Sequence, residues 1–429
     1  MRFRFFKLVF LILFVVSFQH LTAQTSDMKL YELFNKQDYW ELNKQYPLLK
    51  KQASEFYQLF TEAYLDNFFN RPEQSNEKIK QLFDKYKDRL VIENQIVFNI
   101  MYAINLVYMQ NYTEAASIFA NLAEKLENQT DSASLAGYKN AYKQYASLEN
   151  VAPMSVTYGK KQTNIPLGKD TLGYLTLPIS IGKEKSTTLN FTIDFGANFC
   201  MIEERFVNGL NIRILSDSIL FHGAYGASAY GKIGVADEIY LGDILVKNVI
   251  FYIAPNRIIE NYPENEMNAI LGLPVLKALE NLQISNSNFL ISPVSKPSKH
   301  LPNMLISNLN VFIHAQLPKN SLTLLFDSGS KQSTLAKNYL SKNQIDISSF
   351  VADTVHRTGY GGGHEIEVLK MPNFSFKIGN KKLHFPLMDI EMTDVISSNV
   401  PIDGVLGVDV LSQSKKIIFD FKNMYFQVK

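Results

Sequence analysis

Phe191-Thr-Ile-Asp-Phe-Gly-Ala197 and Leu325-Phe-Asp-Ser-Gly-Ser330 are two copies of one short motif in a chain of 429 residues. Each copy is an apolar strand that ends in an aspartate, followed by a variable residue, a glycine and a small residue. One such motif is a weak signal, because aspartate and glycine occur in turns of every kind. Its recurrence 133 positions later predicts an internal repeat in which Asp194 and Asp327 are equivalent.

Three further features follow each aspartate in the same order. They are a stretch rich in glycine and tyrosine (223–226 and 359–363), a glycine between two strands (Gly242 and Gly379), and two apolar residues before a glycine (270–272 and 405–407). The aspartate and the last glycine are 78 residues apart in the first copy and 80 in the second. The turn glycine and the last glycine are 30 and 28 residues apart. The matching order and spacing indicate two equivalent lobes.

The doubled set of motifs resembles the aspartic proteases, particularly the retropepsin-like members. The resemblance covers roughly residues 158–429. It implies a multi-domain chain of α plus all-β class, in which residues 155–297 and 298–429 form a bilobal pair of β-barrels. One chain then supplies both halves that the retroviral enzymes build from two identical subunits. We therefore expect a monomeric aspartic endopeptidase that acts on a peptide or protein substrate.

The resemblance assigns the catalytic role to Asp194 and Asp327. Peptide hydrolysis without a metal ion, a cofactor or a covalent nucleophile needs an activated water and a proton donor to the carbonyl oxygen. Two carboxylates held within about 3 Å cannot both ionise easily, so they share one proton. The ionised partner activates the water and the protonated partner donates to the substrate. Because the pair titrates as a unit, neither aspartate is assigned as the base.

Several positions around the aspartates match elements that support the pair in the family. Gly196 and Gly329 permit a tight turn whose N–H groups approach the carboxylates. Ser330 is expected to hydrogen-bond the outer oxygen of a carboxylate, which its counterpart Ala197 cannot do. The elements expected to pack behind the two turns are Leu271 with Gly272 and Leu406 with Gly407.

Phe195 departs from the family pattern. The family has threonine or serine after the aspartate, and the two hydroxyls hydrogen-bond across the pair and brace it. Ser328 keeps this hydroxyl, whereas Phe195 cannot supply its partner. One lost hydrogen bond is worth about 1 kcal/mol, so the pair is loosened unless Phe195 stiffens the interface by packing. The alternative function is a catalytically degenerate module that binds extended peptides in the same cleft by strand addition.

The two glycine-rich stretches are candidates for flaps that close over a substrate. They contain too much glycine for rigid strand interiors and suit mobile hairpin tips. The expected flap and substrate-binding residues are Gly223, Tyr225, Gly226, Tyr360 and Gly361. The alternative is two ordinary glycine turns with exposed tyrosines.

Residues 27–150 have the apolar period of helices and contain one glycine, Gly137. Breaks are expected at Pro47, at Arg71-Pro72 and at Gln110-Asn111. Residues 111–120 resemble the second helix of a tetratricopeptide repeat, although no clean period of 34 residues is present. We expect a stack of helical hairpins packed on the β region. The alternatives are a dedicated peptide-binding solenoid and a pro-segment or lid over the cleft. A protein partner that binds through the helical region is also expected as an option.

Residues 1–23 are predicted to be a signal peptide. Three basic residues precede an apolar run that is too short to span a bilayer, and small residues before Gln24 offer a cleavage site. Removal takes three of the 43 basic residues and none of the 41 acidic ones, so the formal charge falls from +2 to −1. We expect export to a periplasm or the exterior, with no transmembrane span left after cleavage. An uncleaved anchor or a buried helix is the alternative.

The composition argues against several other classes of protein. With 46% hydrophobic and 20% charged residues, the chain is predicted to fold, and its near-neutral charge predicts no nucleic-acid partner. Cys200 is the single cysteine, so a disulfide framework and a thiolate metal cluster are excluded, and we expect a buried thiol. Neither Gly-x-Ser-x-Gly nor His-Glu-x-x-His occurs. No metal or cofactor is therefore expected.

Overall fold

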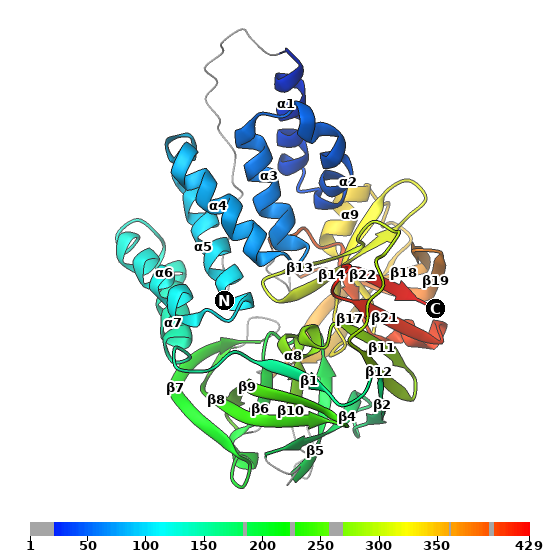
Figure 1. Cartoon of the computed structure of the whole chain (residues 1–429). Coiled ribbons are helices and arrows are strands. Elements are labelled where there is room, and N and C mark those ends of the chain that lie inside the picture. Colours follow the sequence, from blue (N-terminus) through cyan, green and yellow to red (C-terminus); the bar gives the residue numbers. More distant parts are fainter. Residues whose placement is uncertain (1–20, 183–186, 224–227, 257–268, 360–361, 394–398) are drawn as a thin grey trace. The chain divides into compact units, whose positions relative to one another are not determined.

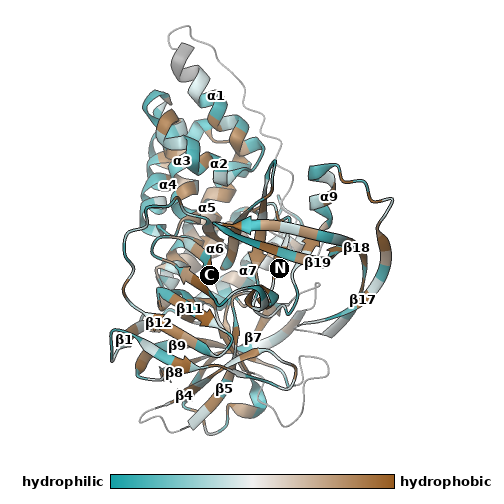
Figure 2. Ribbon diagram, turned by 90° about the vertical axis from the view of Figure 1, so that its right-hand side faces the viewer, coloured by the Kyte–Doolittle hydropathy of each residue, from teal (hydrophilic) through white to brown (hydrophobic). Residues whose placement is uncertain are grey.

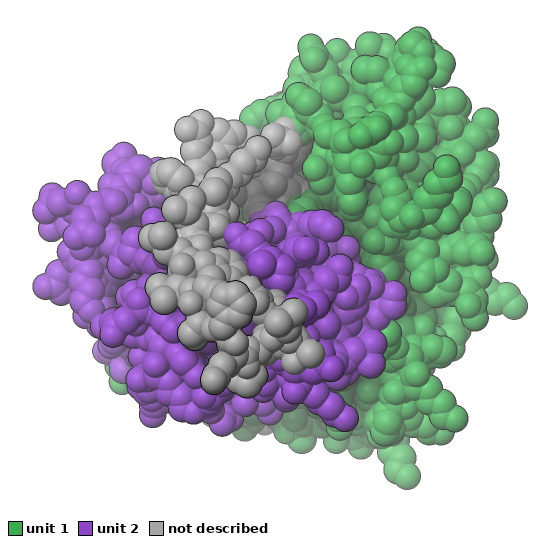
Figure 3. Space-filling model, turned by 90° about the horizontal axis from the view of Figure 1, so that it is seen from above, with its two compact units in different colours: residues 1–2, 150–429 green, residues 3–149 purple. Residues whose placement is uncertain are grey.

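The structure is a computed structural model (Figure 1) that describes residues 21–182, 187–223, 228–256, 269–359, 362–393 and 399–429. The chain divides into two compact units at Glu149 and Asn150 (Figure 3). Unit 2, which ends at Glu149, is helical in its described residues, and residues 150–429 of unit 1 hold the strands. The layout is therefore an α part followed by a β part.

The described residues of unit 2 form a series of consecutive helices. These are α1 (Leu21–Asn35), α2 (Tyr39–Leu49), α3 (Glu55–Phe68), α4 (Pro72–Tyr86), α5 (Ile92–Tyr108), α6 (Tyr112–Lys125) and α7 (Ser132–Ala146). Residues 1–20 of the predicted signal peptide lie outside the described residues, and residues 21–23 begin α1. The signal peptide and its cleavage stay predictions.

One kind of turn ends three of these helices. Gln37, Asn70 and Gln110 follow α1, α3 and α5 with φ angles of 51°, 60° and 61°. A residue in this left-handed conformation ends a helix by redirecting the chain. Asp38 and Asn111 then cap α2 and α6 with side-chain oxygens that accept a backbone N–H. The sequence breaks predicted at these last two turns are confirmed.

The break predicted at Pro47 is wrong. Pro47 lies inside α2, two residues before the helix ends at Leu49. At this position the missing N–H of proline removes a single hydrogen bond from the last turn, so the helix tolerates the proline. The assignment of the unit to tetratricopeptide repeats stays a prediction.

Two groups of strands in unit 1 carry the two copies of the motif. Lobe 1 consists of β1 (Ser155–Tyr158), β3 (Gly168–Lys169), β4 (Leu175–Ile181), β5 (Thr187–Asp194), β6 (Cys200–Glu203), β7 (Ile212–His222), β8 (Ser228–Leu241), β9 (Ile244–Ala254) and β10 (Ala269–Gly272). Lobe 2 consists of β13 (Met304–Ser307), β14 (Asn310–Gln316), β15 (Ser321–Phe326), β16 (Thr334–Ala336), β17 (Val351–Gly359), β18 (Gly362–Ile378), β19 (Lys381–Glu391) and β20 (Gly404–Leu406).

The strand pairings of the two lobes match. In lobe 1 the pairings run β9-β6-β10-β5-β4-β8, and β8 also pairs with β9, which closes a ring of strand pairs. In lobe 2 the pairings run β19-β16-β20-β15-β14-β18, and β18 also pairs with β19, which closes the equivalent ring. Within each ring, one parallel pair joins the aspartate strand to the strand of the apolar-glycine element, β5 with β10 and β15 with β20. The repeat read from the sequence is therefore also a repeat of strand pairing.

A third sheet joins the lobes. Its order is β2 (Thr163–Pro166), β12 (Asn288–Ser292), β11 (Asn281–Ser285), β21 (Lys416–Asp420) and β22 (Tyr425–Val428). The antiparallel pair of β11 and β21 links a strand that follows lobe 1 to a strand that follows lobe 2. Short helical segments precede these two strands, α8 (Leu273–Ala278) and η6 (Val408–Gln413), and α9 (Lys337–Asn343) follows β16.

Alternation along β5 places the first aspartate. Phe191 and Ile193 are fully buried, whereas Thr192 and Asp194 keep partial exposure. Figure 2 shows hydrophobic and hydrophilic residues alternating along strands of unit 1. Because side chains of a strand point to alternate faces, Asp194 points away from the core side of β5.

Candidate active site

Each aspartate stands at the end of a strand held by a parallel neighbour. Asp194 is the last residue of β5, where it lies opposite Gly272 of β10. Asp327 directly follows β15, whose last residue Phe326 lies opposite Leu406 of β20. The N–H of Asp327 donates to the carbonyl of Leu406 at 3.1 Å. The same local construction thus presents both side chains.

The carboxyl groups of Asp194 and Asp327 lie within hydrogen-bonding reach of each other. The N–H of Gly196 donates to Oδ1 of Asp194 at 2.8 Å, and that of Gly329 donates to Oδ1 of Asp327 at 2.8 Å. A methyl group at Gly196 would lie 2.6 Å from Oδ1 of Asp327. One at Gly329 would lie 2.9 Å from Oδ2 of Asp194. Any side chain at either glycine would therefore obstruct the aspartate of the other lobe.

The surroundings favour a proton on this pair. Burial raises the pKa of Asp194, although the N–H groups of Gly196 and Gly329 favour its ionised form. Burial also raises the pKa of Asp327, and the charge of Asp194 raises it further, well above the usual value. Removing both protons would leave two like charges side by side. The pair therefore keeps a shared proton to higher pH than an ordinary aspartate would.

Ser328 braces the pair from lobe 2. The residue is 1% exposed, and its hydroxyl accepts from the N–H of Phe195 at 3.0 Å. The same hydroxyl donates to the carbonyl of Ile193 at 2.8 Å. Because these two residues flank Asp194, one side chain of lobe 2 fixes the backbone of lobe 1 on both sides of its aspartate.

Phe195 braces the pair by packing. Its fully buried ring stacks on Phe419 of β21 with centroids 4.2 Å apart, and meets Phe326 edge-on at 5.3 Å. Phe326 directly precedes Asp327. Aromatic pairs of this geometry add about 0.5–1.5 kcal/mol to the free energy of burial. The hydroxyl expected in the family is thus replaced by an aromatic cluster, which is the stiffening that the sequence left open.

The apolar-glycine elements lie behind the two turns. The N–H of Gly272 donates to Sγ of Cys200 at 3.4 Å, and that of Gly407 donates to Oγ of Ser333 at 3.0 Å. A methyl group at Gly272 would lie 2.2 Å from the carbonyl oxygen of Phe199, so glycine is required there. The apolar residues before the glycines are fully buried (Leu271, Leu406). Cys200 is buried as predicted, and burial raises the pKa of its thiol to about 12.

The hydroxyl of Ser330 does not make the expected bond to a carboxylate, although its N–H lies within hydrogen-bonding reach of the Asp327 carboxyl. Its hydroxyl donates to the carbonyl of Gln332 at 2.8 Å. The N–H of Ser330 donates to the carbonyl of Asp327 at 3.2 Å, and Ala197 makes the equivalent bond to Asp194 at 3.4 Å. Both small residues therefore act through their backbone, which explains why an alanine and a serine occupy equivalent positions.

The predicted flaps are hairpins at equivalent positions of the two lobes. β7 pairs with β8 as far as His222 opposite Ser228, and β17 pairs with β18 as far as Gly359 opposite Gly362. Gly223 is described and directly follows β7. The other expected tip residues lie outside the described residues (Tyr225, Gly226, Tyr360, Gly361). Their role in binding stays a prediction.

Tyr174 is a residue near the aspartates that the sequence did not single out. It directly precedes β4 of lobe 1, and its hydroxyl hydrogen-bonds Thr358 of β17 in lobe 2. Nζ of Lys331, four residues after Asp327, lies 4.6 Å from the centroid of the Tyr174 ring. Burial raises the pKa of Tyr174, and the charges of nearby aspartates add to this. Tyr174 thus contacts the hairpin and the aspartate loop of the opposite lobe.

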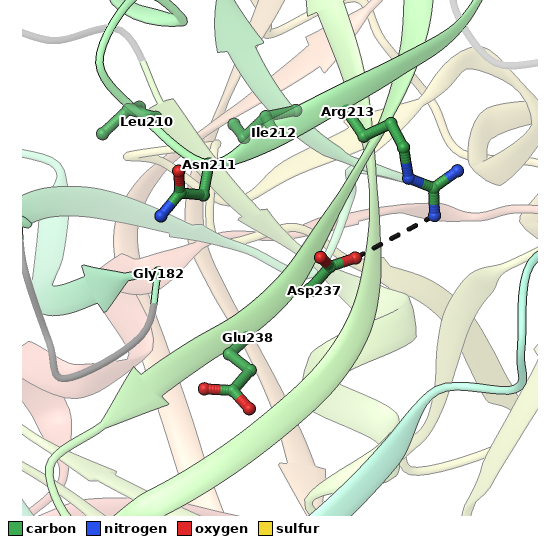
Figure 4. A pocket seen from close by; sticks show the side chains of 7 residues that line it. All are labelled: Gly182, Leu210, Asn211, Ile212, Arg213, Asp237 and Glu238. Atoms are coloured by element: carbon green, nitrogen blue, oxygen red, sulfur yellow. Dashed lines mark ion pairs between the residues drawn. The ribbon is translucent and has the colours of Figure 1, made fainter.

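A cavity of about 540 Å³ lies elsewhere on lobe 1, between the start of β7 and β8 (Figure 4). Figure 4 shows its ion pair, in which Arg213 and Asp237 are 3.9 Å apart. Neither aspartate of the pair lines it. Among the described residues, no group of three or more His, Cys, Asp or Glu side chains is placed to hold a metal ion. The described helices are each too short or too polar to cross a membrane.

The comparison with protein families supports an aspartic-protease-like family for lobe 1. The model described as "Aspartyl protease" matches residues 177–275, which include Asp194 and end just after Gly272. The matched stretch therefore contains the aspartate, the hairpin and the apolar-glycine element of the first copy. No curated protein matches the chain.

Several solved structures are similar to parts of the chain. Conglutin gamma, a basic 7S globulin from lupine seeds, is 12% identical with a TM-score of 0.40, and the match covers 62% of this chain and 94% of that one. Basic 7S globulin from soybean is 10% identical with a TM-score of 0.38, covering 62% and 93%. A retropepsin-like aspartic protease from Rickettsia conorii is 12% identical with a TM-score of 0.22, covering 33% and 94%.

Proposed function

We propose that the chain is an aspartic endopeptidase that hydrolyses peptide bonds with a water held between Asp194 and Asp327. The observation that carries the proposal is the contact between two carboxyl groups from equivalent strand ends of two lobes. Burial and mutual repulsion leave one proton on the pair, which is the state needed to activate a water and to protonate a carbonyl oxygen. The family match over lobe 1 supports the same reaction class.

Each residue around the pair has a role in this mechanism. The N–H groups of Gly196 and Gly329 fix one oxygen of each carboxylate, so the remaining oxygens face the water and the substrate. Ser328 and Phe195 hold the two loops at a constant separation. A rigid pair needs little reorganisation when charge moves from the water to the carbonyl oxygen.

The remaining expectations belong to the same proposal. We take the closed ring of strand pairs in each lobe to be the predicted barrel. A single chain supplies both aspartates, so a monomer is sufficient for activity. Residues 1–23 direct export, and the helical unit recruits a protein partner or substrate.

Replacement of either aspartate tests the proposal. Asp194→Asn and Asp327→Asn each remove one carboxylate with little change in shape, and each is expected to lower cleavage of an unfolded, fluorophore-quenched protein by about a thousandfold or more. Asp237→Asn is the matched control, because Asp237 is an exposed lobe 1 aspartate in the separate cavity. Unchanged turnover in either pair variant, with the thermal unfolding midpoint preserved, would exclude the mechanism.

Phe195 favours one alternative, a module that grips extended peptides without cleaving them. Phe195 takes the place of one bracing hydroxyl of the family, so the pair is braced differently from an ordinary member. A statine peptide, which mimics the tetrahedral intermediate, separates the two functions. An endopeptidase binds the statine more tightly than the matching amide and cleaves the amide. A binding module binds both equally and leaves the amide intact across the pH range.

A further inference from the structure

Each hairpin is joined near its tip to the aspartate loop of its own lobe by a cluster of three side chains. In lobe 1 the cluster is Phe199, Phe221 and Tyr252. The rings of Phe199 and Phe221 meet edge-on at 5.5 Å, and those of Phe221 and Tyr252 are 3.6 Å apart. Phe221 and Tyr252 are buried, and Phe199 is partly exposed. The open side of this cluster is therefore aromatic.

In lobe 2 the corresponding cluster is Gln332, Arg357 and Asp389. Nη2 of Arg357 donates to Oδ2 of Asp389 at 2.9 Å, and Nη1 donates to Oε1 of Gln332 at 3.4 Å. Nε of Arg357 donates to Oε1 of Glu391 at 3.3 Å. The side chain of Arg357 is 19% exposed, and Gln332 is exposed. The open side of this cluster is therefore polar and carries a guanidinium.

The two clusters occupy equivalent places in the repeat. Phe199 and Gln332 are each five residues after their aspartate. Tyr252 and Asp389 lie opposite the residues seven after the aspartates, in the parallel pairs of β6 with β9 and β16 with β19. Their third members, Phe221 and Arg357, each come shortly before the tip of the hairpin. The repeat that makes Asp194 and Asp327 equivalent therefore makes the two clusters equivalent.

Both clusters border the place where a peptide would lie. The carbonyl of Phe199 approaches Gly272, which lies opposite Asp194 in the sheet. Backbone atoms of Gln332 approach Gly407 in the same way in lobe 2. A peptide bound over the aspartates has to pass between the hairpin and the loop of each lobe. Each cluster joins these two elements, so side chains on the two sides of the scissile bond face different clusters.

Charged groups near Arg357 in lobe 2 favour the binding of a substrate carboxylate. Asp389 also accepts from Nζ of Lys370 at 2.8 Å, so a second cation offsets part of the charge of the carboxylates that hold Arg357, although Lys370 is shared with the exposed Asp353 at 3.5 Å. Lys331, adjacent to Gln332, forms no ion pair with any described residue and stacks on Tyr174. The bond of Arg357 to Gln332 is long and has a neutral acceptor. A carboxylate in its place makes a shorter, charge-assisted bond.

We propose, on the premise of the proposed function, that the cleft selects an apolar or aromatic residue beside lobe 1 and an aspartate or glutamate beside lobe 2. Arg357 is then the specificity-determining residue of the lobe 2 side. Asp389 and Glu391 hold its guanidinium in place before the substrate arrives, so little side-chain entropy is lost on binding.

Quenched peptides with phenylalanine on one side of the expected scissile bond and glutamate, lysine or leucine on the other test this inference. Both orders are needed, because symmetry does not define the direction of the peptide. The wild-type protein is expected to prefer glutamate over lysine by roughly tenfold or more in kcat/KM. Arg357→Met is expected to abolish this preference, and Arg357→Lys to keep part of it.

Gln332→Glu provides a second variant if Arg357→Met does not fold. It places a carboxylate of the chain itself beside the guanidinium, so the preference for glutamate is expected to disappear while the ion pairs of Arg357 remain. Arg213→Met is the matched control, because Arg213 is a lobe 1 arginine in an exposed ion pair away from the aspartates. The control is expected to leave the preference unchanged.

The outcomes separate this inference from the proposed function. Cleavage with equal use of glutamate and lysine peptides overturns the inference and leaves the endopeptidase standing. Absence of cleavage, with binding that favours glutamate peptides and loses this preference in Arg357→Met, supports the inference and rejects the enzyme. Absence of both cleavage and binding overturns both. Fluorescence anisotropy with the Asp327→Asn variant measures binding without turnover.

Discussion

Lobe 1 and lobe 2 share a backbone plan and differ in the chemistry around each aspartate. The parallel strand pair, the ring of strand pairs and the glycines of the two loops occur in both. Equivalent side chains that differ include Phe195 and Ser328, Ala197 and Ser330, Cys200 and Ser333, Phe199 and Gln332, and Tyr252 and Asp389. The two lobes therefore keep the same residue where a side chain would collide with a carboxylate or with backbone atoms. Elsewhere each half is free to specialise.

The pH dependence of cleavage is expected to give the largest effect, and it tests whether the two aspartates act as one pair. Activity needs the singly protonated pair. Above the raised pKa of Asp327 the proton is lost, and kcat/KM then falls about tenfold for each pH unit. Because the pKa of Asp327 is raised, this decline begins at higher pH than it would for an ordinary aspartate. A rate profile from about pH 3 to about pH 9 measures it.

Unfolding measurements provide the control for this shift, because they report on the pH range below the raised pKa. The folded chain keeps a proton that an unfolded aspartate releases, so the free energy of unfolding falls as the pH rises from about 3.9 through the raised pKa of Asp327. Asp327→Asn cannot release this proton and is expected to flatten the slope in urea titrations. An identical slope in wild type and variant would contradict a proton retained by the pair.

Phe195→Ala tests how much the aromatic packing around Phe195 contributes to stability. The substitution removes a fully buried ring that packs on Phe419 and Phe326. We expect the free energy of unfolding to fall by about 3–5 kcal/mol, which is large against a typical total of about 5–15 kcal/mol. Chemical denaturation measures it, and Phe195→Leu, which keeps most of the volume, is expected to cost much less. Equal losses in both variants would show that the ring contacts contribute little.

Ser328→Ala tests how much the hydroxyl of Ser328, the equivalent residue in lobe 2, contributes to stability. The N–H of Phe195 and the carbonyl of Ile193 would stay buried without their shared partner. We expect a loss of about 1–3 kcal/mol in the free energy of unfolding, smaller than that of Phe195→Ala. Ser330→Ala is the control, because the hydroxyl of Ser330 is exposed and bonds a nearby carbonyl. A loss larger than that of Phe195→Ala would reverse the ranking of the two braces.

Tyr174→Phe gives the smallest expected effect and tests a hydrogen bond that joins the two lobes near the aspartates. It removes the bond to Thr358 that joins the lobes and keeps the ring on which Lys331 stacks. We expect KM to rise about threefold to tenfold, corresponding to one hydrogen bond of about 1 kcal/mol, with kcat nearly unchanged. Tyr230→Phe is the control, since Tyr230 is an exposed lobe 1 tyrosine. If Thr358→Val adds fully to Tyr174→Phe, the two side chains do not act together.

The sequence predicts the repeat because its spacing is set by backbone requirements. Asp194 and Gly272 lie side by side on adjacent strands, so the interval between them reflects the number of strands in between. The glycines at 196 and 329 are also predictable, because a side chain at either position meets the carboxylate of the other lobe. Such constraints act at fixed positions and leave a visible pattern.

The sequence does not predict interactions that depend on which side chains meet across the lobes. Phe419, the stacking partner of Phe195, lies more than 200 residues away on β21, and no local pattern connects them. Tyr174 is one tyrosine among 22, and only the tertiary structure brings it to Thr358. The carboxylate bond expected of the Ser330 hydroxyl is wrong because a serine hydroxyl bonds a neighbouring carbonyl as easily as a carboxylate.

The sheet shared by the lobes also has a consequence for how the protein is made. β11 leaves the ribosome about 135 residues before its partner β21. At about 5–20 residues per second, its edge waits roughly 7–27 seconds for that partner. An unpaired edge invites pairing with other chains. The nascent protein therefore passes through an interval in which lobe 1 is complete, its aspartate is present, and a chaperone or a neighbouring chain can occupy the place reserved for β21.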